Sequence, residues 1–120
     1  MTLLSLREQG LPLPAAAVLI SPWADLTCSG ETHVSNADVE PMIPLNALRF
    51  ISSSYARGQD PSAPMLSPVF ADLTGLPPLM IQVGNIEVLL SDARRIAERA
   101  QAQRLGSPAR AGIGRWRPSA

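Results

Sequence analysis

The side chains of this chain that could do chemistry begin with its only histidine, His33. It lies in a polar stretch beside Glu31 and Asp38, where an imidazole could act as a stray base or bind a metal. A metal site needs three or four ligands in a set geometry, and one histidine with one cysteine, Cys28, does not supply them. We therefore expect no metal and no cofactor, and we interpret His33 as a solvent-exposed loop residue.

Other candidate nucleophiles and acids also have structural interpretations. Ser67 belongs to a Ser-Pro pair within a loop, with no base near it in sequence, so it is interpreted as a turn residue. Asp25 and Asp72 each precede Leu-Thr, a position where a carboxylate can cap the following turn. Asp92 falls in the first turn of a predicted helix, where a solvated carboxylate is favoured by the helix dipole.

The elements that would position such residues begin with two continuous apolar runs. Ala15–Ile20 and Leu79–Val83 show no alternation, which is typical of strands buried on both faces in parallel sheets. The stretches Trp23–Pro41 and Gln59–Pro78 are polar or rich in proline and are predicted to be loops.

Helical patterns lie between and around these strands. Thr2–Gln9 precedes Gly10, and Leu45–Tyr55 has apolar residues at near-helical spacing. Pro44 suits the first position of this second helix, and Gly58 its end. A third helix is predicted from an apolar stripe of Leu89, Ala93, Ile96, Ala97 and Ala100, with Ser91 as the N-cap, Arg94 paired to Glu98, and Asp92, Arg95, Glu98 and Arg99 facing water.

The order helix, strand, helix, strand, helix indicates an α/β fold. Two strands alone cannot form a stable sheet that is covered on both sides, because each leaves an unpaired edge. The pattern therefore predicts an incomplete sheet that belongs to a larger one.

Three sequence blocks carry a resemblance to a known family. They are Leu11–Thr27, with Ser-Pro-Trp-Ala-Asp-Leu-Thr at its end, Asp60–Pro68, and Asp72–Gly84, with Gly-Leu-Pro-Pro-Leu-Met-Ile-Gln-Val-Gly. In this order the blocks resemble the C-terminal half of esterases of the hormone-sensitive lipase family. The resemblance spans roughly Thr2–Gln103 and implies a partial α/β-hydrolase fold and carboxylic ester hydrolysis by a Ser-His-Asp triad.

The resemblance also implies catalytic parts that this sequence lacks. It has no His-Gly-Gly stretch for an oxyanion hole and no Gly-x-Ser-x-Gly nucleophile elbow. The family's acid follows the glycine after the second strand, as Gly-Ser-Asp-Glu, and here Gly84-Asn85-Ile86-Glu87 puts Ile86 at that position. An isoleucine accepts no hydrogen bond. Glu87 is a weak candidate because a shift of one residue redirects the side chain.

The family's histidine would follow one more strand, in 105–120. This region has no histidine and no strand pattern, so we expect residues 1–104 to form the partial domain and 105–120 a diverged, disordered tail. Its basic part, Arg110–Arg117, could touch an anionic partner, although disorder is the default expectation. The abrupt loss of resemblance after about Arg104 suggests a tail read in a different frame, a hypothesis that translating the neighbouring frame downstream would test.

Composition limits the remaining possibilities. The 120 residues carry ten basic and ten acidic side chains, which argues against a nucleic-acid or membrane-surface partner. No run is long enough to span a bilayer, and no signal peptide is recognised. The single cysteine fits a reducing cytosol, so we expect a cytoplasmic location.

Two hypotheses of function follow. In the first, the chain is a truncated, inactive piece of an esterase whose parent acts on small esters or lactones. In this family the regions around Trp23 and Met42 can line the acyl or alcohol pocket, although simple packing explains both equally well. In the second hypothesis, the chain is a non-catalytic module that pairs its exposed sheet edges with another chain or with itself.

Overall fold

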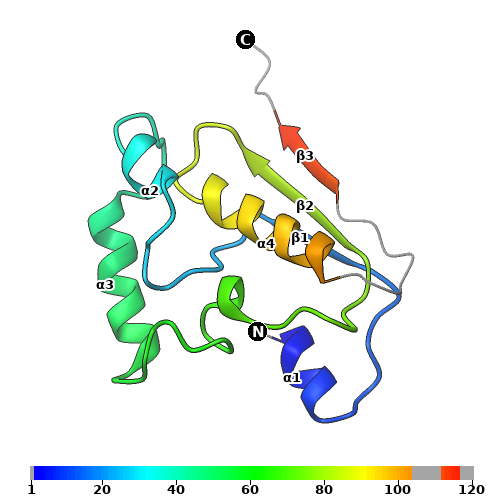
Figure 1. Ribbon diagram of the computed structural model, residues 1–120. Helices are drawn as coiled ribbons and strands as arrows, with labels where there is room; N and C mark the ends of the chain where they lie inside the picture. The colour runs from blue at the N-terminus through cyan, green and yellow to red at the C-terminus, as the bar shows by residue number, and fades with distance from the viewer. Residues whose placement is uncertain (1, 104–111, 117–120) are drawn as a thin grey trace.

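The computed structural model describes residues 2–103 and 112–116 of the chain. Its elements alternate between helices and strands, as predicted, with two short helices inside stretches that were expected to be loops (Figure 1). In chain order they are α1 (Thr2–Glu8), β1 (Ala17–Ile20), α2 (Thr32–Ser35), α3 (Leu45–Ala56), the 3-10 helix η1 (Pro68–Phe70), β2 (Leu79–Gly84), α4 (Leu90–Ala102) and β3 (Gly112–Trp116).

The strands form a parallel sheet in the order β1-β2-β3. Ala17 lies opposite Leu79 and Ile20 opposite Gln82, while Gly84 lies opposite Trp116. The prediction of two parallel strands from the apolar runs is confirmed. The expectation that 105–120 contains no strand is wrong for Gly112–Trp116, because backbone pairing with β2 needs no apolar side-chain pattern. Residues 104–111 and 117–120, including most of the expected tail, lie outside the described residues.

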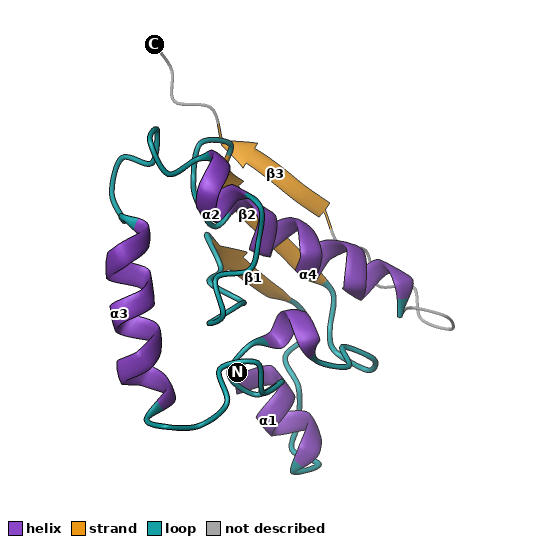
Figure 2. Ribbon diagram, turned by 60° about the vertical axis from the view of Figure 1, so that its left-hand side comes forward, coloured by secondary structure: helices purple, strands orange, loops and turns teal. Residues whose placement is uncertain are grey.

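One face of the sheet holds the core. Leu79, Ile81 and Val83 of β2 point to this side, together with Ala93, Ile96 and Ala97 of α4. Figure 2 shows α4 lying across the strands on this side. Leu4 of α1 joins the same core, so the first helix also packs near the covered face.

The other face of the sheet is exposed, as expected for apolar strands that belong to an incomplete sheet. Ile20 is 74% exposed and Val18 59%, and Met80, the pairing partner of Val18, is 49% exposed. A continuous apolar run shows that both faces of a strand are apolar. Whether both faces are covered depends on helices elsewhere, and α4 covers only one face.

The ends of the helices depart from prediction in small ways. Pro44 is the N-cap of α3 rather than its first residue, and Arg57, in the left-handed region with φ 47°, ends the helix just before Gly58. The N-cap of α4 is Leu89 instead of Ser91, because the Ser91 side chain pairs with Thr32. Within the part of the chain that the structure describes, no helix is long and apolar enough to cross a membrane.

The two faces of β2 give the first testable prediction. Replacing Ile81, which is fully buried against α4, with alanine should lower the free energy of unfolding by about 3 kcal/mol through lost burial and the cavity left behind. The neighbouring change Met80→Ala should cost less than about 1 kcal/mol, because Met80 points to the exposed face. Urea unfolding of both variants measures this difference, and equal losses would contradict the packing of α4 on one face.

Candidate functional site

The candidate site lies where the parallel strands end. In parallel α/β sheets, ligands and catalytic side chains gather beyond the carboxyl ends of the strands. β1 ends at Ile20 and continues into Ser21, and β2 ends at Gly84 and continues into the loop that carries Ile86 and leads to α4 (Figure 1). Ser21 has a positive φ of 45°, an uncommon conformation for serine, at the first position beyond β1.

A carboxylate joins these two strand ends. Oε1 of Glu87 accepts hydrogen bonds from the backbone N–H of Gly84, at 2.7 Å, and from the Ser21 hydroxyl, at 3.0 Å. A Cβ atom on residue 84 would lie 2.7 Å from the same oxygen, so any other residue there would displace the Glu87 side chain. The carboxylate of Glu87 therefore holds the strand ends together, which leaves it a poor replacement for the acid at position 86.

Ile86 itself is partly exposed, at 41%, on the rim of an apolar hollow of about 280 Å³. Besides the loop after β2, this hollow is lined by Pro41, Met42 and Ile43. The structure therefore brings the Met42 region, a predicted pocket-lining region, next to the predicted acid position. Trp23 lies elsewhere, beside a second apolar hollow of about 540 Å³ that also contacts α1 and α3.

The backbone of the loop after β2 is held by three polar side chains that sequence reasoning missed. Thr32 and Asn36 donate hydrogen bonds to carbonyl groups of the loop, and Glu40 accepts one from the Val88 N–H. These three residues stand four apart in the sequence. This helical spacing of polar residues is the signal that could have found them, because it places them on one side of α2 and its continuation.

The only histidine is not a loop residue in solvent. His33 is fully buried in α2, and its Nε2 lies 3.0 Å from Oδ1 of Asp92, which is also fully buried. Oδ2 of Asp92 accepts hydrogen bonds from the backbone N–H groups of Ala24 and Asp25. The exposed positions expected for His33 and Asp92 are therefore wrong, because a carboxylate of α4 meets polar groups of α2 and of the loop after β1. Neither His33 nor Asp92 lines the hollow beside Ile86.

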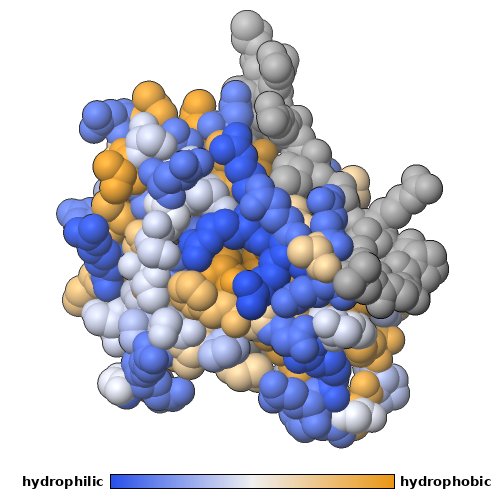
Figure 3. All heavy atoms as spheres, viewed as in Figure 1, coloured by the Kyte–Doolittle hydropathy of each residue, from blue (hydrophilic) through white to orange (hydrophobic). Residues whose placement is uncertain are grey.

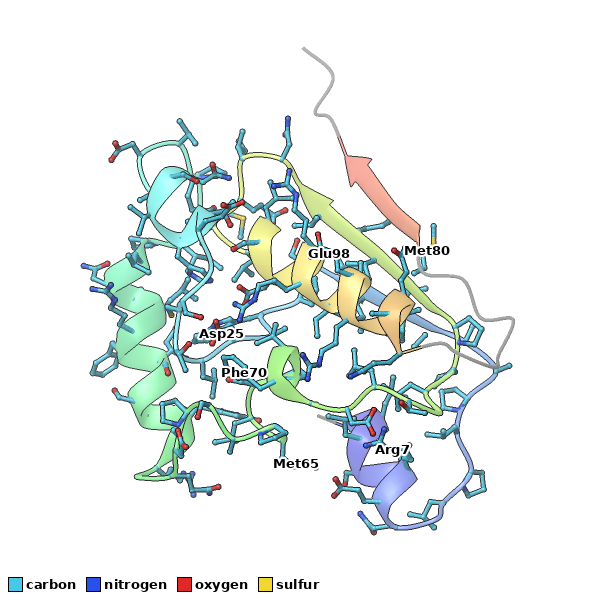
Figure 4. The ribbon with its side chains drawn as sticks, viewed as in Figure 1. Arg7, Asp25, Met65, Phe70, Met80 and Glu98 are labelled. Atoms are coloured by element: carbon cyan, nitrogen blue, oxygen red, sulfur yellow. The ribbon has the colours of Figure 1, made fainter. Side chains whose placement is uncertain are left out.

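Asp25 lies in a second buried polar cluster. Its Oδ1 accepts the Thr27 N–H, which confirms the predicted capping of the following turn, and Oδ2 lies 2.7 Å from Nη1 of Arg95. Figure 4 shows Asp25 beside the first turns of α4, near Phe70, whose ring lies 5.5 Å from the Arg95 guanidinium carbon. Burial raises the pKa of Asp25, but hydrogen bonds from Ser29, Thr27 and Arg95 outweigh burial and lower this pKa to about 2.

The other candidate residues from the sequence also make structural contacts. Ser67 is fully buried and bonds two loops, by donating to the Pro61 carbonyl and accepting from the Leu26 N–H. Oδ1 of Asp72 accepts the Thr74 N–H, which confirms the predicted turn cap. Burial raises the pKa of the Cys28 thiol, which disfavours a thiolate nucleophile.

Charges over α4 complete the description. Figure 3 shows hydrophilic side chains gathered over this helix. Arg94 lies 3.8 Å from Glu31 of the loop before α2, in place of the predicted partner Glu98. Among the residues that the structure describes, no three histidine, cysteine, aspartate or glutamate side chains stand together as metal ligands.

The low pKa of Asp25 predicts a pH dependence of stability. Because the folded-state value lies near 2 and the ordinary value is 3.8, the ionised carboxylate stabilises the fold at pH above 4. This contribution, about 2 kcal/mol, is lost as the pH falls from about 4 to 2. Asp25→Asn should be less stable at pH 7 and lose this acid-dependent step, as measured by urea unfolding between pH 2 and 7. The exposed change Asp38→Asn is the control, and an unchanged step in Asp25→Asn would contradict the assignment.

Comparison with known proteins agrees with this architecture. A family model for the α/β-hydrolase fold matches residues 1–110. An acetyl-hydrolase of Streptomyces hygroscopicus is 51% identical over 96 residues, which are 80% of this chain and 32% of that protein. An esterase of Acinetobacter venetianus is 36% identical over 99 residues, which are 82% of this chain and 33% of that protein. The chain thus spans about one third of the length of these relatives.

Solved structures give the same result. The structure of an esterase from the bacterial hormone-sensitive lipase family has a TM-score of 0.88 and 44% identity, and the match covers 95% of this chain and 37% of that one. The structure of a hormone-sensitive lipase from a metagenome library has a TM-score of 0.88 and 39% identity, covering 96% of this chain and 38% of that one. The chain belongs to the α/β-hydrolase fold family and is similar to esterases of the hormone-sensitive lipase type, as the three sequence blocks indicated.

Proposed function

We propose that this chain forms the acid-loop side of a carboxylic ester hydrolase of the hormone-sensitive lipase type, and that these 120 residues do not hydrolyse esters by themselves. The observation that carries the proposal is the loop after β2. It follows β2, where the family resemblance expects the acid loop, and it has Ile86 at the position where that resemblance expects the carboxylate. Its neighbour Glu87 is bonded to Ser21 and Gly84.

The chemistry of the family explains why these residues matter. A serine attacks the ester carbonyl, a histidine takes the serine proton, and a carboxylate orients that histidine and stabilises its charged form. The only histidine of this sequence, His33, is buried against Asp92, and the sequence has no Gly-x-Ser-x-Gly elbow. These 120 residues therefore supply the loop that would carry the catalytic acid, but not the acidic side chain.

The proposed substrate class for the whole protein is small uncharged esters. The hollow beside Ile86 is lined mainly by apolar side chains, which suits an acyl or alcohol group, and its volume of about 280 Å³ limits the group to a small one. The relative from Streptomyces hygroscopicus is named an acetyl-hydrolase, and this name supports a short acyl group in the substrate. A cytoplasmic location remains our proposal as well, and the single cysteine supports it.

An esterase assay tests the proposal directly. With p-nitrophenyl acetate and butyrate, the purified chain should give rates equal to those of buffer, because positioned proton transfer and the nucleophile are both missing. Turnover well above buffer that disappears in Glu87→Gln would show that Glu87 acts as the acid after all. Turnover that survives in Glu87→Gln but disappears in Ser67→Ala would point to Ser67 as the nucleophile.

The bare face of the sheet favours a second candidate function, a module that associates through its sheet. Val18 and Ile20 expose apolar side chains on β1, whose outer edge pairs with no other strand that the structure describes. Such a surface can be covered by another chain or by a second copy.

Measuring the mass in solution checks this second candidate. Static light scattering over a range of concentrations should show a mass above 12.8 kDa if copies associate through the sheet. Ile20→Lys, which adds a charge to the exposed face, should then restore the monomer mass, whereas Phe50→Lys on α3 should not. A monomer mass at every concentration would exclude self-association.

A further inference from the structure

We infer that Thr32, Asn36 and Glu40 are positioning residues that hold the backbone around residue 86, so that the acid loop keeps its geometry whichever side chain stands at that position. The polar stripe, as we call these three residues, lies on α2 and the turns that follow it. The importance of position 86 rests on the proposed function, but the contacts and their test do not.

Asn36 holds the loop on both sides of residue 86. Its Nδ2 donates to the carbonyl of Asn85, at 3.3 Å, and to the carbonyl of Glu87, at 2.9 Å. These carbonyls belong to the residues immediately before and after Ile86. The Asn85 carbonyl lies in the peptide plane between residues 85 and 86, and the Glu87 carbonyl in the plane between 87 and 88. Fixing these two planes limits the backbone rotations at residues 86 and 87, and with them the direction of the side chain at 86.

Thr32 and Glu40 hold the end of the loop at Val88. The Thr32 hydroxyl donates to the Val88 carbonyl at 2.7 Å, and Oε2 of Glu40 accepts the Val88 N–H at 2.9 Å. Oε1 of Glu40 accepts the N–H groups of Met42 and Ile43, which line the hollow beside Ile86. One carboxylate thus joins the acid loop to the opposite wall of the hollow.

All contacts of the polar stripe to the loop are made to backbone atoms. None depends on the side chains of residues 85–88, so replacing an acid with isoleucine at 86 removes no hydrogen bond of this set. Asn36 and Glu40 are also not needed to attach α2 to α4. His33 with Asp92, and Thr32 with Ser91, already bind α2 to α4. The side chain of Asn36 bonds to the loop after β2, and that of Glu40 joins this loop to Met42 and Ile43.

Asn36→Ala tests the inference, with Asn46→Ala as the matched control, since Asn46 is exposed on α3 and bonds only to its own neighbour Ala47. Amide hydrogen exchange at Glu87 and Val88 should become about tenfold faster in Asn36→Ala, because the loop loses the two hydrogen bonds that Asn36 donates to it. The carbonyl carbon resonances of Asn85 and Glu87 should move in the NMR spectrum, while amides of α4 keep their exchange rates.

A second variant covers the case in which Asn36→Ala unfolds. Glu40→Gln keeps the shape of the side chain but turns one oxygen into an amide, so the Val88 or the Met42 N–H loses its acceptor and exchanges about tenfold faster. Glu98→Gln, exposed on α4, is its control.

Each outcome decides between a local and a general role. Local changes at residues 85–88 in either variant support the inference. Unchanged exchange and resonances there, or a uniform rise along the whole chain in both variants, would overturn it. Because no measurement here uses ester hydrolysis, the inference can fail while the proposed function stands, and the reverse also holds.

Discussion

The rest of the structure depends on the buried carboxylate of Asp92. A buried carboxylate is costly unless hydrogen bonds compensate its lost hydration, and here both oxygens are used. Oδ2 accepts the N–H groups of Ala24 and Asp25, and Oδ1 meets Nε2 of His33 at 3.0 Å. One side chain of α4 therefore binds the segment that follows β1 and also the short helix α2. Since α4 packs on the sheet, these polar contacts place α2, and with it the polar stripe, above the ends of the strands. Gly30 allows the segment before α2 to approach α4 closely, because a Cβ atom on residue 30 would lie 2.2 Å from Oγ of Ser91.

The apolar and polar contacts divide the molecule along the strands. On the covered face, Ile81 and its neighbours meet α4 through burial alone, a contact that has no directional requirement. At the carboxyl ends, hydrogen bonds with defined geometry join β1, the loop after β2 and α2. The burial keeps the layers together, and the hydrogen bonds give the loop one conformation. Ile86 stands in that loop without contributing to either set of contacts, since its side chain is partly exposed and the loop is held through its backbone.

Whether a feature could be predicted from the sequence depends on how far apart in the chain the interacting residues lie. The strands at Ala17–Ile20 and Leu79–Gly84 and the helices around them follow from local periodicity and from glycine and proline, and their prediction succeeded. The burial of His33 could not be predicted, because its partner Asp92 lies 59 residues away. β3 escaped prediction for a similar reason, since its pairing with β2 uses backbone groups that almost any sequence offers. Ile86 lies beyond the end of β2 as expected, because its place follows from counting from a strand end, and its assignment as the acid position stays a prediction. The side chains that hold its loop come from α2 and the turns that follow it, about fifty residues earlier in the chain.

The bare sheet face and the isoleucine at position 86 have different physical causes. Val18, Ile20 and Met80 are side chains of the kind that a neighbouring layer covers, and the chain spans about one third of the relatives that it matches. Adding structure beyond these residues could bury that face without changing any of its side chains. Adding structure cannot give Ile86 a carboxylate, so no covering layer restores the missing group. Glu87 cannot move into the position without releasing Gly84 and Ser21, because its oxygen holds both strand ends. Under the proposed function and the predicted acid position, a hydrolase that contains this segment would orient its histidine with a carboxylate from another part of the protein, or leave that histidine without one.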